Sequence, residues 1–542
     1  MKTLIEHLEN LISKENVITS GEVFEEFATS TMKETTNPSA ILFPRNELEV
    51  TQIIELFNKK NADTPDEKAV LYPLSSGKNW GYTSSEAGMD KAFILSLKNL
   101  NQISEYKKDT GSVRIQAGVT QKQLYSFLQR HGAKHWMDAT GSSEACSVLA
   151  NSLERGFGHT PAGNHFEFIS EFDIVLGSGE RISTGFRQFS KPGQTFYSES
   201  IYKWGLGPYI DGLFSQSSMG IVLSATLKLM RAPECYLPFF ISSKEPESLG
   251  ELVESLRGLR EKSIVKSCVH IANFDKSIQA ALDETDWPLS TTLMTDKTKE
   301  RHRKKYLLNE WTASGALYGT KEEIAVWKRI IKRSLINGKF KVRFISEKKL
   351  AMLRYIAPVA SKIFDLKIDK TLEKLDDLIK LKRGQPTNAF LKSVHFKTTR
   401  LPNDNNFTLL ERNFVGLIWL APTAPATGEH AKQLSTIVTR CLKQYNIEAA
   451  ISMTMLTDQA LECVISLIYD RRIDGSDLTA EACHLNLHTE LLNSGYLTYR
   501  MNSLQQRDFD LFYTSSLTPT LTKVKASLDP NGVFAIGKYG IH

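Results

Sequence analysis

A stretch rich in glycine and small polar residues is the part of this sequence best suited to bind a charged ligand. It runs from Trp136 to Phe166 and contains two histidines, at positions 159 and 165, and glycines at Gly141, Gly156, Gly158 and Gly163. Glycine lets the backbone approach a ligand closely because it has no Cβ. Consecutive backbone N–H groups can then form a concave site for an anion such as a pyrophosphate.

Another stretch of similar character lies upstream, so it is the first glycine-rich stretch in chain order and Trp136–Phe166 is the second. Leu71 to Tyr82, with the sequence LYPLSSGKNWGY, follows an apolar segment and ends in aromatic residues. Neither stretch contains the GxxxxGK[ST] pattern of a Walker loop, and neither has a GxGxxG pattern that opens a helix after a strand. Glycine-rich segments are often plain loops, so their meaning depends on the elements around them.

Predicted strands and helices surround both stretches. Ala69–Pro73 and Gly220–Met230 are predicted strands because they are apolar segments beside turn residues. A helix is predicted from Thr120 to His131, where a threonine N-cap precedes an apolar face. The first stretch therefore continues from a strand, and the second follows a helix.

The pattern changes near Pro233. From 234 to 490, strand-like segments alternate with long charged helices, which predicts an α+β region with helices laid over a sheet. The N-terminal segment carries acidic residues between its apolar ones and is typical of an amphipathic helix, not of a signal peptide. No run of eighteen apolar residues occurs, so no membrane span is expected.

The composition is that of a globular protein, with 41% hydrophobic and 24% charged residues. A formal net charge of +6 is small for 542 residues, and the basic residues are scattered, so no nucleic-acid partner is expected. Six cysteines without metal-binding spacing predict no metal site and suit a reducing compartment. We therefore expect a cytoplasmic protein.

In this order, the two glycine-rich stretches resemble the flavin-binding segments of the vanillyl-alcohol oxidase / p-cresol methylhydroxylase family. The resemblance continues through GPYIDGLFSQSSMG from Gly207, GALYG from Gly315, Tyr499–Arg500 and the C-terminal DPNGVFAIGKYGI. Its pattern is closest to the 4-alkylphenol and vanillyl-alcohol oxidase branch. It implies an α+β fold with a p-cresol methylhydroxylase type FAD-binding domain in two parts, 1–233 and 491–542. The cap domain, 234–490, would place helices over an antiparallel sheet.

The resemblance implies FAD as the cofactor and assigns its binding residues. The first stretch would direct backbone donors at the pyrophosphate, and an ERGxGxTPxG pattern would wrap around the cofactor. The matching positions are Pro73, Ser75, Ser76, Gly77, Lys78, Asn79, Trp80, Thr140, Gly141, Ser142, Ser143, Asn151, Glu154, Arg155, Gly156, Gly158, Thr160, Gly163, Gly220, Ile221, Val222 and Lys538.

The phenol-oxidising members of the family hold their substrate as a phenolate between two tyrosines and an arginine. By this resemblance, the candidates here are Tyr82, Tyr499 and Arg500. Arginine is always charged and offers a rigid fork of donors, and charge-assisted hydrogen bonds are about twice as strong as neutral ones. A phenolate pushes electron density towards its para position, which lowers the barrier to hydride loss there and leaves a quinone methide.

Two departures from the family pattern bear on the chemistry. Glu462–Cys463 stands where members with a histidyl-linked flavin have a histidine pair. We therefore expect FAD without a covalent bond, with a cysteinyl bond through Cys463 as the alternative. The aspartate that vanillyl-alcohol oxidase has near the flavin is missing, with Ser142 as the nearest match. Glu144 and His159 are then the candidate catalytic bases, since a histidine titrates near neutral pH.

These features predict an FAD-dependent oxidoreductase that removes a hydride from the benzylic carbon of an alkylphenol or aryl alcohol. Dioxygen or an electron-transfer protein would accept the electrons, and the resemblance implies a homodimer. The alternative is an FAD-dependent oxidase of a non-phenolic alcohol, hydroxy acid or biosynthetic intermediate on the same scaffold. A binding protein without activity is a third possibility, against which the intact glycines speak.

Overall fold

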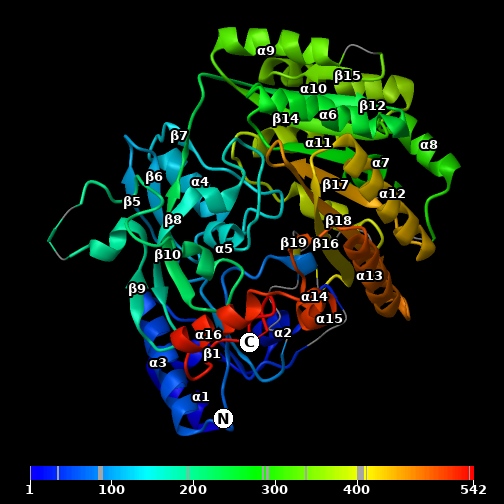
Figure 1. Cartoon of the computed structure of the whole chain (residues 1–542). Coiled ribbons are helices and arrows are strands. Elements are labelled where there is room, and N and C mark those ends of the chain that lie inside the picture. Colours follow the sequence, from blue (N-terminus) through cyan, green and yellow to red (C-terminus); the bar gives the residue numbers. More distant parts are fainter. Residues whose placement is uncertain are drawn as a thin grey trace.

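The fold combines helices with four sheets, which confirms the predicted α+β class. It is known from a computed structural model that describes residues 2–32, 36–82, 89–191, 193–194, 196–283, 286–287, 292–335, 338–398, 408–410, 412–535 and 537–542. Figure 1 shows the two ends of the chain together at one end of the molecule and a broad sheet at the other.

The N-terminal region contains a small sheet that supports the first glycine-rich stretch. Its strands are β1 (Val17–Ile18), β2 (Ala40–Leu42), β4 (Phe93–Ser96) and β3 (Leu71–Leu74), in that order. The helices beside it are α1 (Lys2–Ile12), α2 (Glu22–Ala28) and α3 (Glu47–Asp63). The ring of Phe57 in α3 packs edge-on against Phe93, 5.1 Å away. The apolar face of α3 therefore fixes the sheet from which the first stretch leaves, at the end of β3.

A second, antiparallel sheet supports the other glycine-rich stretch. Its order is β5 (Ile103–Lys107), β6 (Ser112–Gln116), β10 (Ile221–Lys228), β8 (Ile169–Val175) and β9 (Arg181–Ser183). The predicted helix is confirmed as α4 (Gln121–Arg130), with a capping box built by Thr120 and Gln123. Between α4 and β8 lie the strand β7 (His135–Trp136), which pairs with β11 (Met230–Arg231), and the short helix α5 (Val148–Leu153).

The third main layer is an eight-stranded sheet, which we call the cap sheet. Every neighbouring pair of its strands is antiparallel. The order is β15 (Lys341–Phe344), β12 (Cys235–Ser243), β14 (Trp311–Gly319), β13 (Val269–Asn273), β17 (Ala450–Met455), β18 (Ala460–Asp470), β16 (Val415–Pro425) and β19 (Thr498–Arg500). Seven of these strands lie within 234–490, but β19 comes from the C-terminal segment. The domain boundaries at 233 and 490 stay a prediction.

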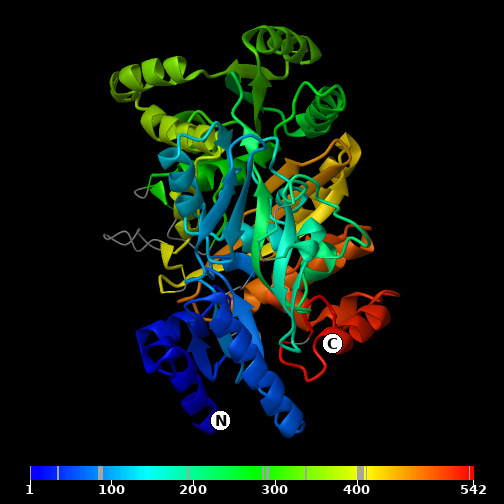
Figure 2. The same cartoon turned by 90° about the vertical axis from the view of Figure 1, so that its left-hand side faces the viewer.

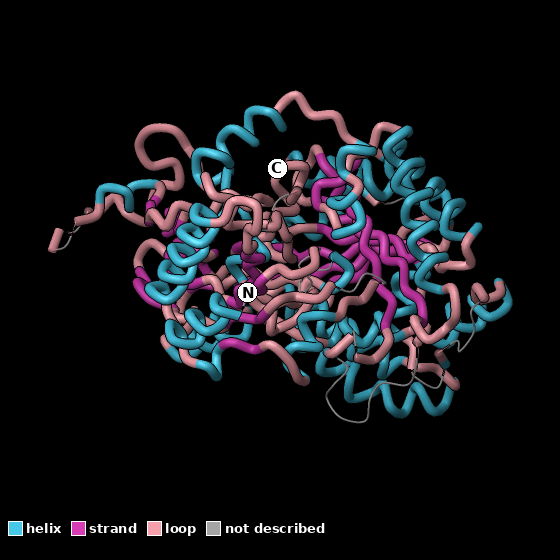
Figure 3. Tube along the Cα trace, turned by 90° about the horizontal axis from the view of Figure 1, so that it is seen from below, coloured by secondary structure: helices cyan, strands magenta, loops and turns pink. Residues whose placement is uncertain are grey.

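Helices cover the two faces of the cap sheet differently. One face packs into a single large apolar core with α6 (Leu249–Glu261), α9 (Lys321–Ser334), α12 (Gly428–Gln444) and α13 (Ser476–Asn493). The short helix α7 (Phe274–Ala281) contacts β13, β14 and β17, and also α11 (Ile368–Leu381) and the 3-10 segment η8 (Ala389–His395). Figures 2 and 3 show the strands crossing the middle of the molecule between these helices. The remaining helices of this region are α8 (Asp296–Lys305) and α10 (Glu347–Phe364).

The C-terminal segment returns from the cap sheet to the N-terminal region. After β19 it forms α14 (Ser503–Arg507), α15 (Phe509–Phe512) and α16 (Thr518–Leu528). Phe534 then bridges Leu71 of β3 in parallel, and the Asn61 side chain of α3 donates to the carbonyls of Asn531 and Gly532 at 3.3 Å each. None of the helices described is long and apolar enough to cross a bilayer.

Candidate active site

Two adjoining cavities lie where the glycine-rich stretches meet the cap sheet. The cradle cavity, of about 450 Å³, is bordered by the loop after β3, by α5 and by the C-terminal segment. The cap cavity, of about 400 Å³, lies between the second glycine-rich stretch, the cap sheet and helices α7 and α11. The residues that line both cavities are Lys78, Asn79, Tyr82, Cys146, Asn151 and Arg500. The two cavities therefore form one continuous site.

Many of the predicted cofactor residues line this site. Gly77 has a φ of 64°, a left-handed conformation that favours glycine. Those at the cradle cavity are Pro73, Ser75, Ser76, Gly77, Lys78, Asn79, Asn151, Glu154 and Lys538. Those at the cap cavity include Thr140, Gly141, Ser142 and Gly156.

The other predicted cofactor residues support the walls from behind. Trp80 packs in an apolar cluster with Leu391 and Val394, and the hydroxyl of Ser143 donates to Asn388 at 2.9 Å. The guanidinium of Arg155 donates to Ser215 at 3.3 Å. The remaining predicted cofactor-binding residues do not border either cavity. They are Gly158, Thr160, Gly163, Gly220, Ile221 and Val222. Their direct contact with a cofactor stays a prediction.

Asp138 organises the second glycine-rich stretch, and the sequence reasoning missed it. Its carboxylate accepts from the backbone N–H of His159 at 3.1 Å and of Thr160 at 2.6 Å, and it contacts Nε2 of His165 at 2.6 Å. A Cβ added at Gly158 would lie 1.4 Å from the Asp138 carboxylate. Close packing of the loop on this carboxylate therefore requires glycine at 158, whether or not a ligand approaches. An aspartate inside a stretch of small residues was the available signal.

Glu154 links the C-terminal segment to the cradle. Lys538 donates to its carboxylate at 2.7 Å, the Tyr539 hydroxyl donates at 3.0 Å, and Arg500 lies 3.9 Å away. Burial alone would raise the pKa of Glu154, but the positive charges of Lys538 and Arg500 lower it to about 2. The carboxylate is therefore ionised and holds both cations at the junction of the cavities.

The structure brings Tyr82, Tyr499 and Arg500 together at that junction. Tyr82 ends the short 3-10 helix at 80–82, and the other two lie on β19. The Arg500 guanidinium lies over the Tyr82 ring, 4.3 Å from its centroid, and donates to Asn79 at 2.7 Å. The two tyrosine hydroxyls lie close enough to influence each other's ionisation. Burial raises the pKa of Tyr82, and it raises the pKa of Tyr499 by a larger amount. Both hydroxyls therefore stay protonated.

Two stacked histidines form another part of the cap cavity wall. The rings of His159 and His270 lie 4.0 Å apart. Nε2 of His270 meets the Gly158 carbonyl at 3.1 Å and Nδ1 meets the Thr454 hydroxyl at 3.0 Å, which assigns the Nε2–H tautomer because a carbonyl only accepts. Burial first, and then neighbouring positive charge, lowers the pKa of His159 well below its usual value and that of His270 to about 3. Both rings are therefore neutral near pH 7.

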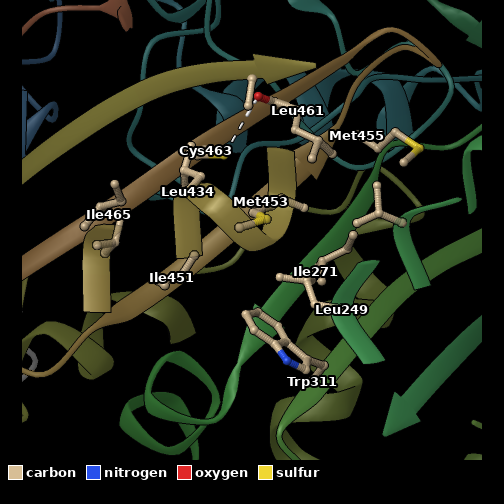
Figure 4. Close-up of a cluster of buried hydrophobic side chains, with 14 of the residues drawn as sticks. Leu249, Ile271, Trp311, Leu434, Ile451, Met453, Met455, Leu461, Cys463 and Ile465 are labelled. Carbon is tan, nitrogen blue, oxygen red and sulfur yellow. Dashed lines mark hydrogen bonds between the residues drawn. The ribbon is translucent and has the colours of Figure 1, made fainter. Parts of the chain in front are cut away.

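Two residues singled out from the sequence lie away from the site. Glu144 forms an ion pair with Lys122 at 2.9 Å and borders neither cavity, so it is not a candidate base. Cys463 lies on the core face of β18, packed among Leu434, Met453 and Ile465 (Figure 4). Val464, the next residue, points the other way and lines the cap cavity. Side chains alternate along a strand, so the cysteinyl alternative through Cys463 is not supported.

The cradle cavity fits an FAD pyrophosphate. Glu154 is the one acidic residue among the described residues that line it, against Lys78, Arg500, Arg507 and Lys538. Within the described parts of the chain, the buried Nε of Arg500 and the buried hydroxyl of Ser218, both at this cavity, have no hydrogen-bond partner. Buried polar atoms are rarely left unpaired, and a doubly charged anion with acceptor oxygens complements this set.

Comparisons with known proteins agree with this interpretation. Residues 38–185 match the family model described as an FAD binding domain. The chain is 28% identical to 1'-carboxy-chondrochloren decarboxylase of Chondromyces crocatus, over 94% of this chain and 92% of that protein. It is 26% identical to the 4-cresol dehydrogenase (hydroxylating) flavoprotein subunit of Pseudomonas putida, over 93% of this chain and 88% of that protein.

The fold agrees as well. The crystal structure of p-cresol methylhydroxylase with substrate bound superposes with a TM-score of 0.87 at 23% identity, covering 100% of this chain and 96% of that one. Three predictions are thereby confirmed: the resemblance to this family, the assignment of the chain as an enzyme, and FAD as its cofactor. The chain is an FAD-dependent oxidoreductase, and it is similar over nearly its whole length to flavoproteins of the p-cresol methylhydroxylase type.

Proposed function

We propose that this enzyme removes a hydride from the benzylic carbon of a para-substituted phenol, which Tyr82, Tyr499 and Arg500 hold as a phenolate. The observation that carries the proposal is the meeting of the buried Tyr82 and the half-buried Tyr499 with the buried Arg500, where the two cavities join. Bound FAD supplies the acceptor for the hydride.

The electrostatics of this trio favour ionisation of the substrate over ionisation of the protein. Burial raises the pKa of both tyrosines, so they remain hydrogen-bond donors. Arg500 stays charged, because Glu154 offsets the effect of burial and the pKa of its guanidinium is raised. A phenol placed against two neutral donors and one cation loses its proton more easily, since hydrogen bonds to the charged form lower a pKa. The negative charge then lies on the substrate, where it assists hydride loss.

The quinone methide left by hydride loss has several fates. Water can add to it, or a neighbouring proton can leave to give an alkene. A carboxylate on the carbon next to the benzylic carbon can also leave as carbon dioxide. The electrons of the broken C–C bond then form the alkene and restore the aromatic phenolate. The similarity to a decarboxylase favours this third fate as a second candidate. The neutral His159 is suited to accept a hydrogen bond during these steps.

We also infer that FAD is held without a covalent bond. Among the six cysteines, all in the described part of the chain, Cys146 is the one that lines the cavities. Burial raises the pKa of its thiol, and a protonated thiol is a poor nucleophile. Cys463 is buried in the core.

A matched pair of compounds tests the proposal. 4-Ethylphenol and its methyl ether have the same benzylic carbon, but only the phenol can become a phenolate. We expect the enzyme to oxidise the phenol and not the ether. Oxidation of both at equal rates would contradict a phenolate-dependent reaction and would favour a non-phenolic substrate class.

A further inference from the structure

The cap cavity carries positive charge on the wall formed by α7 and α11. Lys276 of α7 and Lys374 of α11 both line it. The residues of α11 that face the cavity are Thr371, Lys374, Leu375, Leu378 and Leu381, a spacing that defines one face of the helix. Lys374 is therefore fixed on the cavity side of α11 among apolar neighbours.

No aspartate or glutamate is among the described residues that line the cavity, and Asp377 acts on Lys374 from outside this lining. The Lys276 ammonium donates to the Ser466 hydroxyl at 3.2 Å. The Lys374 ammonium lies 3.7 Å from the centre of the Phe390 ring, and the described residues offer it no hydrogen bond or ion pair. Both lysines are half-buried in the cavity wall, and a charge that is partly withdrawn from water is stabilised by a partner of opposite charge.

The two lysines lie at a distance from the phenol-binding trio. Ser466, which holds Lys276, is on β18, and β16 separates that strand from β19, which carries Tyr499. Neighbouring strands lie about 4.8 Å apart, so the separation across the sheet is roughly 10 Å. A phenol with a short acidic side chain in the para position spans such a distance.

We propose that Lys276 and Lys374 bind a carboxylate on the para side chain of the substrate, so that the natural substrate is an acidic para-substituted phenol. The identity of the substrate rests on the proposed function, whereas the binding of a carboxylate by the lysines does not. The ammonium groups would each donate a charge-assisted hydrogen bond to one carboxylate. They would select acidic substrates over neutral alkylphenols of the same length.

The protonation of the lysines gives this selection a pH dependence. Burial lowers the pKa of Lys276 to about 8 and that of Lys374 to about 7. Asp377 on α11 raises the pKa of Lys374, whereas Lys276 on α7 and Lys392 on η8 lower it. Both ammonium groups are mostly charged below about pH 6.5, and they lose their protons in turn as the pH rises through about 7 and 8. Binding of a carboxylate should weaken over the same range.

Calorimetric titration of the FAD-loaded enzyme with 3-phenylpropionate and with its amide tests the proposal. Neither compound has a phenol, so the measurement does not depend on the proposed reaction. At about pH 6.5 we expect the acid to bind about tenfold to a hundredfold more tightly than the amide. This preference should fall by about pH 9, and it should be reduced in Lys276→Met and in Lys374→Met.

Two further variants control for changes in folding. Lys374→Arg keeps the charge and should keep the preference for the acid. Lys380→Met removes a lysine of the same helix that pairs with Asp376 and Asp377 and should change nothing. Equal binding of acid and amide by the wild type, or an unchanged preference in the Lys276→Met/Lys374→Met double variant, would overturn the proposal. A preference for the acid in an enzyme that oxidises no phenol would instead count against the proposed function alone.

Discussion

Arg500 connects the two halves of the site through its contacts. It donates to Asn79 in the first glycine-rich stretch, lies near Glu154 beside the second and covers the Tyr82 ring. One cation therefore serves the cradle cavity and the cap cavity together. Tyr499, its neighbour in the chain, reaches the same point and acts on the ionisation of Tyr82.

Removing single groups from this trio should slow the reaction, and in the tyrosine variants it should do so without loss of FAD. A charge-assisted hydrogen bond is worth roughly 1.5–3 kcal/mol. Tyr499→Phe is therefore expected to slow flavin reduction by a phenol about tenfold to a hundredfold. Arg500→Lys should be similarly slow because it loses the bidentate fork. Stopped-flow experiments measure the rate of flavin reduction in each variant, and the flavin content of each variant serves as the control. A normal reduction rate in Tyr499→Phe would remove the tyrosine from the site.

Glu154 gives a pH-dependent contribution to stability. Its pKa is lowered from 4.5 to about 2 in the folded protein, so its stabilisation is complete above about pH 4.5 and is lost as the pH falls towards 2. The shift of about 2.5 units corresponds to about 3 kcal/mol at most. Glu154→Gln should be less stable at neutral pH and lose less stability on acidification, as urea midpoints can show. Glu300→Gln, from the surface pair with Lys304, is the control.

At the scale of single residues, the sequence pointed to some groups and not to others. The tandem of Tyr499 and Arg500 could be found because it is contiguous in the chain. Asp138 offered only the signal of an aspartate within a stretch of small residues. Lys374 could not be found, because its place in the cavity wall is set only by folding. Glu144 was a wrong candidate because its side chain turns outwards to Lys122, a direction that neighbouring residues in the sequence do not reveal.

At the scale of elements, the alternation of β18 decides which side chains reach the cap cavity. Val464 faces the cavity, whereas Cys463 and Ile465 face the apolar core (Figure 4). The sequence could predict the strand from its apolar residues but not which of its faces lay towards the flavin side. That choice depends on the cap sheet as a whole, which has helices on both faces.

This geometry predicts that FAD leaves the protein on acid denaturation. Precipitation of the unfolded chain should leave the yellow colour in the supernatant, and the mass of the polypeptide should equal that of the unmodified sequence. A polypeptide with the added mass of FAD would contradict the prediction. Mass analysis of Cys146→Ser and Cys463→Ser would then identify the linked cysteine, if one is involved.

The second glycine-rich stretch should depend on its contact with Asp138. Gly158→Ala would put a methyl group into the Asp138 carboxylate, so we expect poor FAD retention and a lower unfolding temperature. Gly258→Ala is the matched control, since a Cβ at this position in α6 has open space around it and alanine favours a helix. Full flavin content in Gly158→Ala would show that the loop tolerates the displacement.

At the scale of the molecule, the site exists because distant segments converge. The 3-10 helix at 80–82, β19 at 498–500 and helix α11 at 368–381 all border the cap cavity. The order of motifs along the chain was enough to predict the fold class, since a family resemblance carries the architecture with it. It was not enough to predict the cap cavity, because α11 and η8 contribute much of its wall and their position beside α7 is set only by folding. The homodimer stays a prediction that light scattering on the purified protein can check.

The most direct test of the proposed reaction measures whether the benzylic C–H bond breaks during flavin reduction. In anaerobic stopped-flow experiments, 4-ethylphenol should reduce the bound FAD, and the same compound deuterated at the benzylic carbon should do so several times more slowly. Equal rates would mean that breakage of this bond does not limit flavin reduction. If none of the phenols in a panel of para-substituted compounds reduced the flavin, the proposed reaction would be contradicted.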